Sequence, residues 1–155
     1  MIKILVVSDC HGNRDILKKI LEKEEEDTQI FFDCGDSLAG YGDTFPFATV
    51  KGNCDIFSDL PKHITMESPL GNIYVTHGEM GIDNISRMIM QLSPKPDILL
   101  YGHTHKCRYD YICGCHCINP GSVALPRDGS GGTYLIIEGT NKNDLRWGFR
   151  KIVDL

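Results

Sequence analysis

The chain has 155 residues, of which 41% are hydrophobic, and a formal net charge of −5 at neutral pH. This length is enough for one well-packed domain and too short for two ordinary ones, so we expect a single domain over residues 1–155. Duplex DNA is bound mainly through Lys and Arg contacts to phosphate, and the acidic balance gives no basic face for such contacts. We therefore expect no duplex nucleic acid among the partners.

The apolar runs are short, and the run over 2–7 falls far below the roughly 18 residues that a membrane-spanning helix needs. No membrane association is expected. Asp9 and His11 arrive too early for the pattern of a secretion signal. The seven cysteines, an odd number, then indicate reduced thiols and not a disulfide framework. Together these features predict a cytoplasmic protein.

The first element is a continuous aliphatic run over 2–7, which is typical of a strand buried on both faces of a sheet. It ends at Ser8, directly before Asp9-Cys10-His11. Apolar residues then recur at helical spacing, which predicts a helix from residue 13 to about residue 26, with Asn13 as its cap. The acidic run over 22–27 is interpreted as a solvated helix end.

The next strands are expected over 30–32 and 47–50, separated by a glycine-rich loop over 37–44. The strand–helix–strand order predicts that the first two strands are parallel, joined by a right-handed crossover. Asp36 and Asn53 follow these two strands and so lie at the same edge of the sheet as the end of the first strand.

The second half predicts further strands over 64–67, 73–76 and 97–100, with a helix over 84–91 between the last two. Its C-terminal third is expected to be antiparallel: a hairpin over 108–112 and 115–118, closed by a tight turn over 119–122, then strands over 133–138 and 145–152. Strand–helix units followed by hairpins predict an α/β fold in which two mixed β-sheets pack together and helices flank them.

Polar side chains follow five of these strands. In chain order they are Asp9 and His11, Asp36, Asn53, His77, and His103 with His105. Seven oxygen and nitrogen donors without a thiolate suit two first-row divalent ions better than one structural zinc. A pair of ions needs a bridging carboxylate, and Asp36 is the candidate because the preceding Gly35 lets the chain turn sharply into the site.

The ordered motifs Asp-x-His, Gly-Asp, Gly-Asn-Cys-Asp, His-Gly and Gly-His-Thr-His resemble those of the calcineurin-like metallophosphoesterase superfamily. The short chain with Asn-Pro-Gly-Ser at 119–122 is similar to the small YfcE-type branch of bacteria and archaea. The resemblance covers nearly the whole chain, and it implies an α/β sandwich of two sheets flanked by helices.

The resemblance also implies ligand roles. The first metal would be held by Asp9, His11 and His105, the second by Asn53, His77 and His103, and both by Asp36. Manganese is the implied ion, with nickel, iron and zinc as alternatives. The residues expected to be catalytic are Asp36, Asn53 and His103.

The implied activity is phosphodiester hydrolysis of low specificity on a small phosphodiester or nucleotide-like substrate. A metal-bridging hydroxide, formed from water whose pKa the metals lower toward ~7, would attack phosphorus in line. Many members of the superfamily have His where this chain has Cys54, and a thiol is a poorer general acid than imidazole. What protonates the leaving group therefore stays open, although Cys at this position is usual in the YfcE-type branch.

Two other functions are considered. A retromer-subunit type of interaction scaffold has a similar fold but has no need for all seven donors, and a phosphomonoesterase or protein phosphatase would be expected to carry His in place of Cys54. A homo-oligomer is compatible with the sequence. The cluster over 113–117 is interpreted as a hairpin and not as a zinc site, because His116 points away from Cys115 and Cys117. A further hypothesis is that the thiols beside the presumed ligands, Cys10, Cys34 and Cys54, are sensitive to oxidation.

Overall fold

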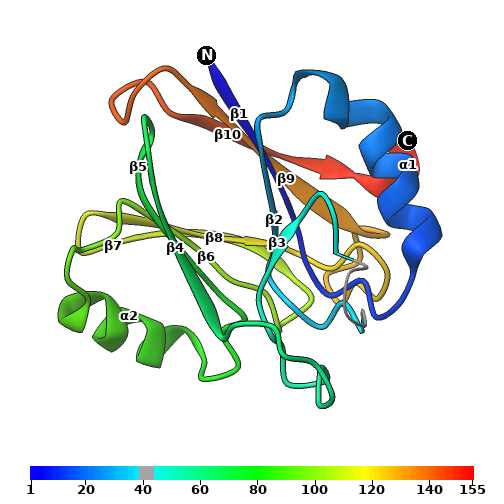
Figure 1. Ribbon diagram of the computed structural model, residues 1–155, viewed down its shortest axis with the longest axis horizontal. Coiled ribbons are helices and arrows are strands. Elements are labelled where there is room, and N and C mark those ends of the chain that lie inside the picture. Colours follow the sequence, from blue (N-terminus) through cyan, green and yellow to red (C-terminus); the bar gives the residue numbers. More distant parts are fainter. Residues whose placement is uncertain (39–43) are drawn as a thin grey trace.

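The computed structural model describes residues 1–38 and 44–155. Two five-stranded mixed sheets pack face to face, with one helix outside each sheet (Figure 1). The first has the order β10-β9-β1-β2-β3, with β1 (Ile2–Val7), β2 (Ile30–Asp33), β3 (Ala48–Thr49), β9 (Thr133–Gly139) and β10 (Arg146–Lys151). The second has the order β4-β5-β6-β8-β7, with β4 (His63–Ser68), β5 (Gly71–Thr76), β6 (Ile98–Leu100), β7 (Cys107–Ile112) and β8 (Cys115–Pro120). This arrangement confirms the predicted fold class.

The two α-helices are α1 (Arg14–Glu24) and α2 (Ile82–Gln91), and single turns of 3₁₀-helix follow at Glu25–Asp27 and Ile152–Asp154. Asn13 caps α1 as predicted, because its side chain accepts a hydrogen bond from the backbone N–H of Ile16. Within the described residues, no helix has the length and apolar character needed to cross a membrane.

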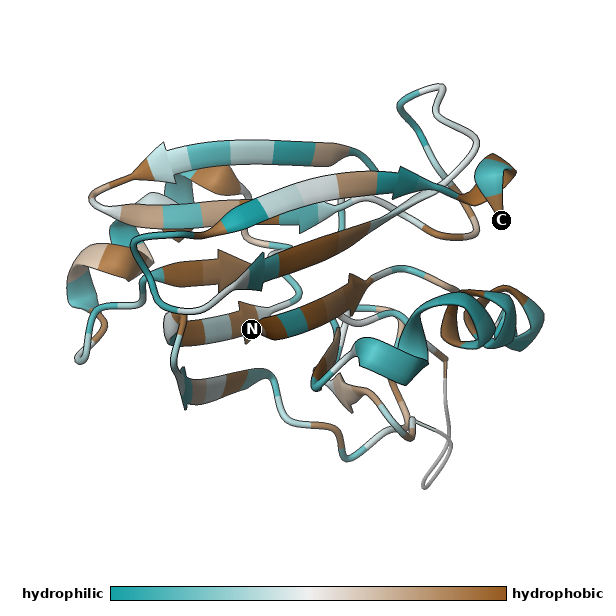
Figure 2. Ribbon diagram, turned by 90° about the horizontal axis from the view of Figure 1, so that it is seen from above, coloured by the Kyte–Doolittle hydropathy of each residue, from teal (hydrophilic) through white to brown (hydrophobic). Residues whose placement is uncertain are grey.

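Strand β1 shows how alternation builds the layers. Its residues Ile4 and Val6 lie in the core between the two sheets, whereas Leu5 and Val7 pack with Ile20 under α1. Burial of each such side chain stabilises the fold by about 1.5–3 kcal/mol, so a strand buried on both faces anchors both layers. Figure 2 shows hydrophobic residues along the central strands and hydrophilic residues over much of α1.

Parallel pairing brings the carboxyl ends of neighbouring strands level. Strands β1 and β2 are parallel, as predicted, and Val7 at the end of β1 pairs with Asp33 at the end of β2. In the second sheet, β5 and β6 are also parallel, and Val75 pairs with Leu100. The loops that follow these four strands therefore emerge at the same edge of the sandwich.

The predicted hairpin ends differently from expectation. Asn119 and Pro120 continue β8 and pair with Arg108 and Cys107 of β7, so the predicted turn over 119–122 begins only at Gly121. Strand β8 is also parallel to β6, so the C-terminal third is not purely antiparallel. The strand continues because its C-terminal half is buried on both faces, with Cys117, Ile118 and Asn119 all shielded from solvent.

Helix α2 begins two residues before the predicted start at residue 84, directly after Gly81. Residues 39–43 of the predicted glycine-rich loop lie outside the described residues.

The acidic run over 22–27 is not simply a solvated helix end, because Glu24 is buried. Its carboxylate accepts hydrogen bonds from Lys3 Nζ at 2.7 Å and from the Tyr134 hydroxyl at 2.8 Å, and Asp27 joins Lys3 at 2.6 Å. Burial alone would raise the pKa of Glu24, but the hydrogen bonds from Lys3 and Tyr134 lower the pKa below its ordinary value. This group ties α1 to strands β1 and β9.

We predict that Glu24→Ala destabilises the fold by about 3–5 kcal/mol, because it leaves the Lys3 ammonium buried with only one partner. The control Glu22→Ala, on the exposed side of α1, should change stability by less than about 0.5 kcal/mol. Chemical denaturation measures both. Since the pKa of Glu24 is depressed, its contribution should be present above pH 4.5 and be lost as the pH falls below that value. Equal stabilities of the two variants would contradict this account.

Candidate metal centre

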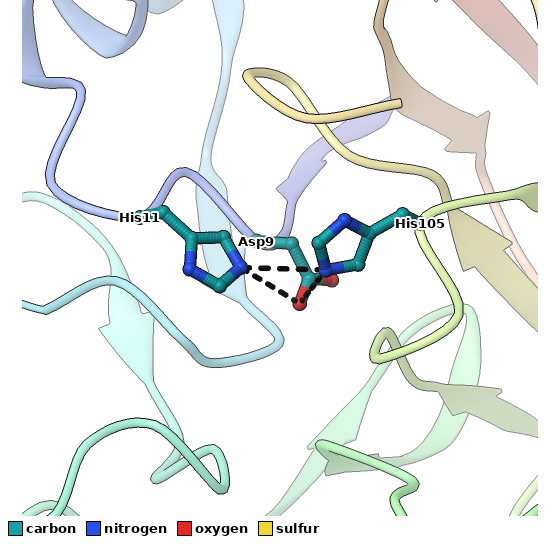
Figure 3. Close-up of side chains that lie close together, drawn as sticks. All are labelled: Asp9, His11 and His105. Carbon is teal, nitrogen blue, oxygen red and sulfur yellow. Dashed lines mark hydrogen bonds and ion pairs between the residues drawn. The ribbon is translucent and has the colours of Figure 1, made fainter. Parts of the chain in front are cut away.

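All seven residues predicted from the strand ends converge at one edge of the sandwich. Asp9, His11 and His105 form a first group, with Nε2 of His105 lying 3.3 Å from both Asp9 Oδ1 and His11 Nε2 (Figure 3). His11 Nε2 lies 3.9 Å from the same Asp9 oxygen. The three donor atoms lie within 4.8 Å of one another, a spacing compatible with one shared cation.

The other four residues form a second group around Asp36 and Asn53. His77 Nε2 lies 3.2 Å from Asp36 Oδ2 and 3.0 Å from Asn53 Oδ1. His103 Nδ1 approaches the same Asn53 oxygen at 3.1 Å.

The two groups are joined through their carboxylates. His11 of the first group lies 3.9 Å from Asp36 Oδ2, and His77 of the second lies 3.8 Å from Asp9 Oδ1. The seven donors predicted to bind two ions therefore form one continuous cluster, and Asp36 lies between the two groups.

The backbone at these positions is unusual. Seven non-glycine residues of the described chain have a positive φ, and five of them belong to the cluster: Asp9, His11, Asp36, His103 and His105. Such a conformation costs about 1–3 kcal/mol per residue and persists only where the surroundings enforce it. Here backbone hydrogen bonds do so, since the N–H of Asp9 donates to Gly35 O and the N–H of His11 donates to Asp36 O.

One buried oxygen of the cluster accepts no hydrogen bond within the described residues. Asp9 is fully buried, and its Oδ2 accepts hydrogen bonds from the Ser8 hydroxyl at 2.6 Å and the backbone N–H of His103 at 3.0 Å. Its Oδ1 accepts no hydrogen bond from any residue in 1–38 or 44–155. A buried carboxylate oxygen is very unfavourable without compensation, and a divalent cation among these oxygen and nitrogen donors would supply it. The residues present therefore fit a metal.

Two of the histidines are oriented by hydrogen bonds at the ring nitrogen that faces away from the cluster. His77 Nδ1 donates to the carbonyl oxygen of Cys34 at 2.7 Å, and His105 Nδ1 donates to that of Leu125 at 2.7 Å. Because a carbonyl can only accept, Nδ1 carries the proton and Nε2 faces the cluster. Histidines that bind metals almost always have such a partner on the other nitrogen.

The charges of the carboxylates control protonation in the cluster. Burial lowers the pKa of His77, but the hydrogen bond to Asp36 and the charge of Asp9 outweigh it and raise the pKa to about 9. Burial raises the pKa of Asp36, yet hydrogen bonds from His77 and the Cys54 backbone N–H lower it to about 2. Asp36 is therefore ionised at neutral pH, and a cation that binds His77 Nε2 must displace its proton.

Sequence reasoning missed residues that position the donors. Asp55 is buried, and its carboxylate accepts backbone N–H bonds from Asp36 at 2.9 Å, Gly52 at 2.8 Å and Leu38 at 2.9 Å. Ser122 donates its hydroxyl to the carbonyl oxygen of Asp9 at 2.8 Å. The only signal for Asp55 was its place in the Gly-Asn-Cys-Asp motif, from which no role was inferred.

The three thiols beside the presumed ligands differ in exposure. Cys10 and Cys34 are buried, and burial raises the pKa of the Cys10 thiol to about 12 and that of Cys34 far above its ordinary value. Cys54 is exposed, and its Sγ lies within 4.8 Å of donor atoms of His11 and Asp36. Exposure therefore restricts the hypothesis of oxidative sensitivity to Cys54, where it stays a prediction, because the core shields the other two thiols from an oxidant.

The cysteines of the hairpin lie apart from this cluster. Cys115 and Cys117 are buried, while His116 accepts a hydrogen bond from the Tyr109 hydroxyl at 2.8 Å or donates one to it. Among the residues that the structure describes, no set of three potential ligands forms there. The geometry agrees with the hairpin interpretation.

The chain matches the model of the calcineurin-like phosphoesterase superfamily domain over residues 2–142. It is 32% identical over 146 residues to the probable metallophosphoesterase YsnB of Bacillus subtilis, and the aligned region covers 91% of this chain and 85% of YsnB. It is 25% identical over 167 residues to the phosphodiesterase YfcE of Escherichia coli, with 89% of this chain and 88% of YfcE covered.

Solved structures share the fold. A predicted phosphoesterase from Streptococcus pneumoniae superposes with a TM-score of 0.83 at 24% identity, covering 97% of this chain and 90% of that one. Vacuolar protein sorting 29 of Cryptosporidium parvum superposes with a TM-score of 0.74 at 13% identity, covering 97% of each chain. At these identities the likeness concerns the fold alone, whereas the family match extends over most of the sequence. Because of that match, the chain belongs to the calcineurin-like phosphoesterase superfamily, and membership of a family of metallophosphoesterases implies that divalent metal ions bind.

Proposed function

We propose that the cluster holds two divalent cations, manganese in the first instance, and that the protein hydrolyses small phosphodiesters with low specificity. The observation that carries the proposal is the buried Oδ1 of Asp9, which accepts no hydrogen bond within the described residues and lies among donors that form two connected groups. The ligand sets are those that the family resemblance implies, with Asp36 shared between the two ions. The relatedness to a phosphodiesterase, YfcE, supports a diester substrate.

Bound cations would polarise the phosphoryl oxygens, activate water and offset the charge that develops during hydrolysis. The chain's own residues prepare the site for this chemistry. Asp36 stays ionised at working pH, because its pKa is about 2. Asn53 Oδ1 lies within 3.1 Å of both His77 and His103, so it fixes the relative positions of these two rings.

His103 and Cys54 are the residues best placed to meet a substrate. His103 is half-buried and its Nδ1 faces Asn53, which leaves Nε2 as the donor that we assign to a phosphoryl or leaving-group oxygen. The exposed Cys54 has a raised pKa, through partial burial and the nearby Asp36 charge, so its thiol stays protonated. Because this thiol is a weak acid, it would protonate a leaving group poorly, so substrates with good leaving groups are favoured.

The scaffold alternative is less favoured. A protein that serves only as an interaction scaffold would gain nothing from a buried unpaired carboxylate oxygen and five positive-φ ligand positions, which lower stability. The likeness to vacuolar protein sorting 29 concerns the fold alone. For a phosphomonoesterase or protein phosphatase, the presence of Cys54 in place of His remains the counter-argument. We also keep a cytoplasmic location and the absence of a duplex nucleic acid partner as proposals.

The substrate class is tested with manganese-loaded protein and two chromogenic esters. Bis(p-nitrophenyl) phosphate should be hydrolysed at least about tenfold more efficiently, in kcat/KM, than the monoester p-nitrophenyl phosphate. Both release the same leaving group, so the comparison reports the preference for a diester over a monoester. A protein that cleaves the monoester well and leaves the diester untouched would refute the diesterase assignment.

The positioning role of Asp55 gives a second prediction. Asp55→Asn replaces one acceptor oxygen by an NH₂ group that faces backbone N–H donors, so we expect a destabilisation of about 2–3 kcal/mol. The loops that carry Asp36 and Asn53 should loosen, and manganese affinity measured by calorimetry should fall at least about tenfold. Asp59→Asn, the same change at an exposed position of the same loop, is the matched control. If both variants bound manganese as the unmodified chain does, Asp55 would have no positioning role.

A further inference from the structure

A pocket of about 380 Å³ opens beside the metal cluster. Its lining includes Gly78, Tyr101, Thr104, Lys106, Arg108 and Arg127. Gly78 directly follows His77, and Thr104 lies between His103 and His105 in the sequence. The pocket therefore begins one residue from three of the proposed metal ligands, on segments that they share.

Three basic side chains line this pocket in a chain whose net charge is −5. Arg108 is held by Asp110, with contacts of 2.7 and 3.2 Å. For Lys106 and Arg127, the described part of the chain provides no carboxylate ion partner. The neighbouring Asp128 is occupied by the backbone N–H groups of Cys107 and Ser130. Two uncompensated cations thus face a common space.

The pocket also contains a hydrogen-bond donor without a partner. Tyr101 is 2% exposed, and its hydroxyl makes no hydrogen bond within residues 1–38 and 44–155, but this oxygen is not among the fully buried polar atoms there, so it is open to a ligand in the pocket. Burial raises the pKa of Tyr101 to about 12, so the hydroxyl keeps its proton at neutral pH. An oxyanion in the pocket would satisfy this donor together with the two cations.

The pocket wall is tied to the metal cluster. The backbone N–H of Arg127 donates to the carbonyl oxygen of His105 at 2.9 Å. The amide of Asn119 donates to Gly102 O at 3.0 Å and to Thr104 Oγ1 at 3.1 Å. A ligand that spans pocket and cluster would therefore meet groups held in a fixed relation to each other.

We propose that this pocket binds a second phosphate of the substrate, so that the preferred substrates are phosphodiesters carrying an additional terminal phosphate, such as a phosphorylated dinucleotide. Lys106, Arg127 and the Tyr101 hydroxyl bind that terminal phosphate, while the diester lies at the metal cluster. Ile82, also in the lining, provides an apolar surface for the connecting nucleoside. The inference rests on the proposed phosphodiesterase function and specifies its substrate class.

The test is a binding measurement that does not depend on turnover. Dithymidine with a phosphorothioate linkage, which resists hydrolysis, is titrated into manganese-loaded protein with a terminal 5′-phosphate, a 3′-phosphate or neither. We expect one phosphorylated form to bind at least about tenfold more tightly than the unphosphorylated form. Lys106→Gln and Arg127→Gln should each remove most of this difference, and Lys62→Gln, at an exposed position outside the pocket, should preserve it.

Equal affinity for all three forms would overturn the pocket assignment, as would a difference that survives both substitutions. Hydrolysis of bis(p-nitrophenyl) phosphate, which carries no second phosphate, separates the two proposals. If this diester is cleaved while the dinucleotides bind equally, only the pocket fails; if the phosphorylated dinucleotide binds preferentially but no diester is cleaved, the pocket stands and the phosphodiesterase function fails.

Discussion

The placement of two carboxyl groups, those of Asp9 and Asp36, in the interior of the same sheet edge is the constraint on which the rest of the structure depends. Asp9 is fully buried and Asp36 is 2% exposed, and both lie within 4 Å of shared histidines. Like charges in a medium of low dielectric repel strongly and lose their hydration. Without compensation the arrangement would favour protonation or local unfolding. Its persistence requires positive charge, which the His77 imidazolium supplies in part and divalent cations would supply fully.

The fold resists this repulsion by fixing the loops from several directions. Level parallel strands bring four loops to one edge, and the core between the sheets holds those strands in register. Asp55 then binds three backbone N–H groups of the loops around Asp36, and Ser122 binds the backbone of Asp9. Five donors are held with a positive φ as a result. A site built in this way is preorganised, because its geometry is set by the scaffold before any ligand arrives.

The strand-end pattern was sufficient to predict the fold class and the convergence of all seven donors. Residues 2–7 form a strand because all but Lys3 are aliphatic, and the order of strand and helix determines that Asp9 and Asp36 share an edge. These inferences depend on local periodicity and on topology, both of which can be read along the chain.

Features that depend on long-range contacts could not be predicted. Glu24 looked solvated because its partners Lys3 and Tyr134 come from other elements. Asp55 acts on backbone groups, which leave no trace in the side-chain pattern. The pocket cations Lys106 and Arg127 are far apart in sequence and meet only because the loop after β8 returns to His105.

Electron paramagnetic resonance of the protein titrated with Mn²⁺ tests the central claim most directly, because two ions that share a carboxylate are magnetically coupled. We expect the six-line signal of isolated Mn²⁺ to give way to a coupled spectrum as the second equivalent binds, and Asp36→Asn to abolish the coupling. Saturation by one equivalent, or two bound ions whose spectrum stays uncoupled in the unmodified protein, would contradict a shared pair of cations.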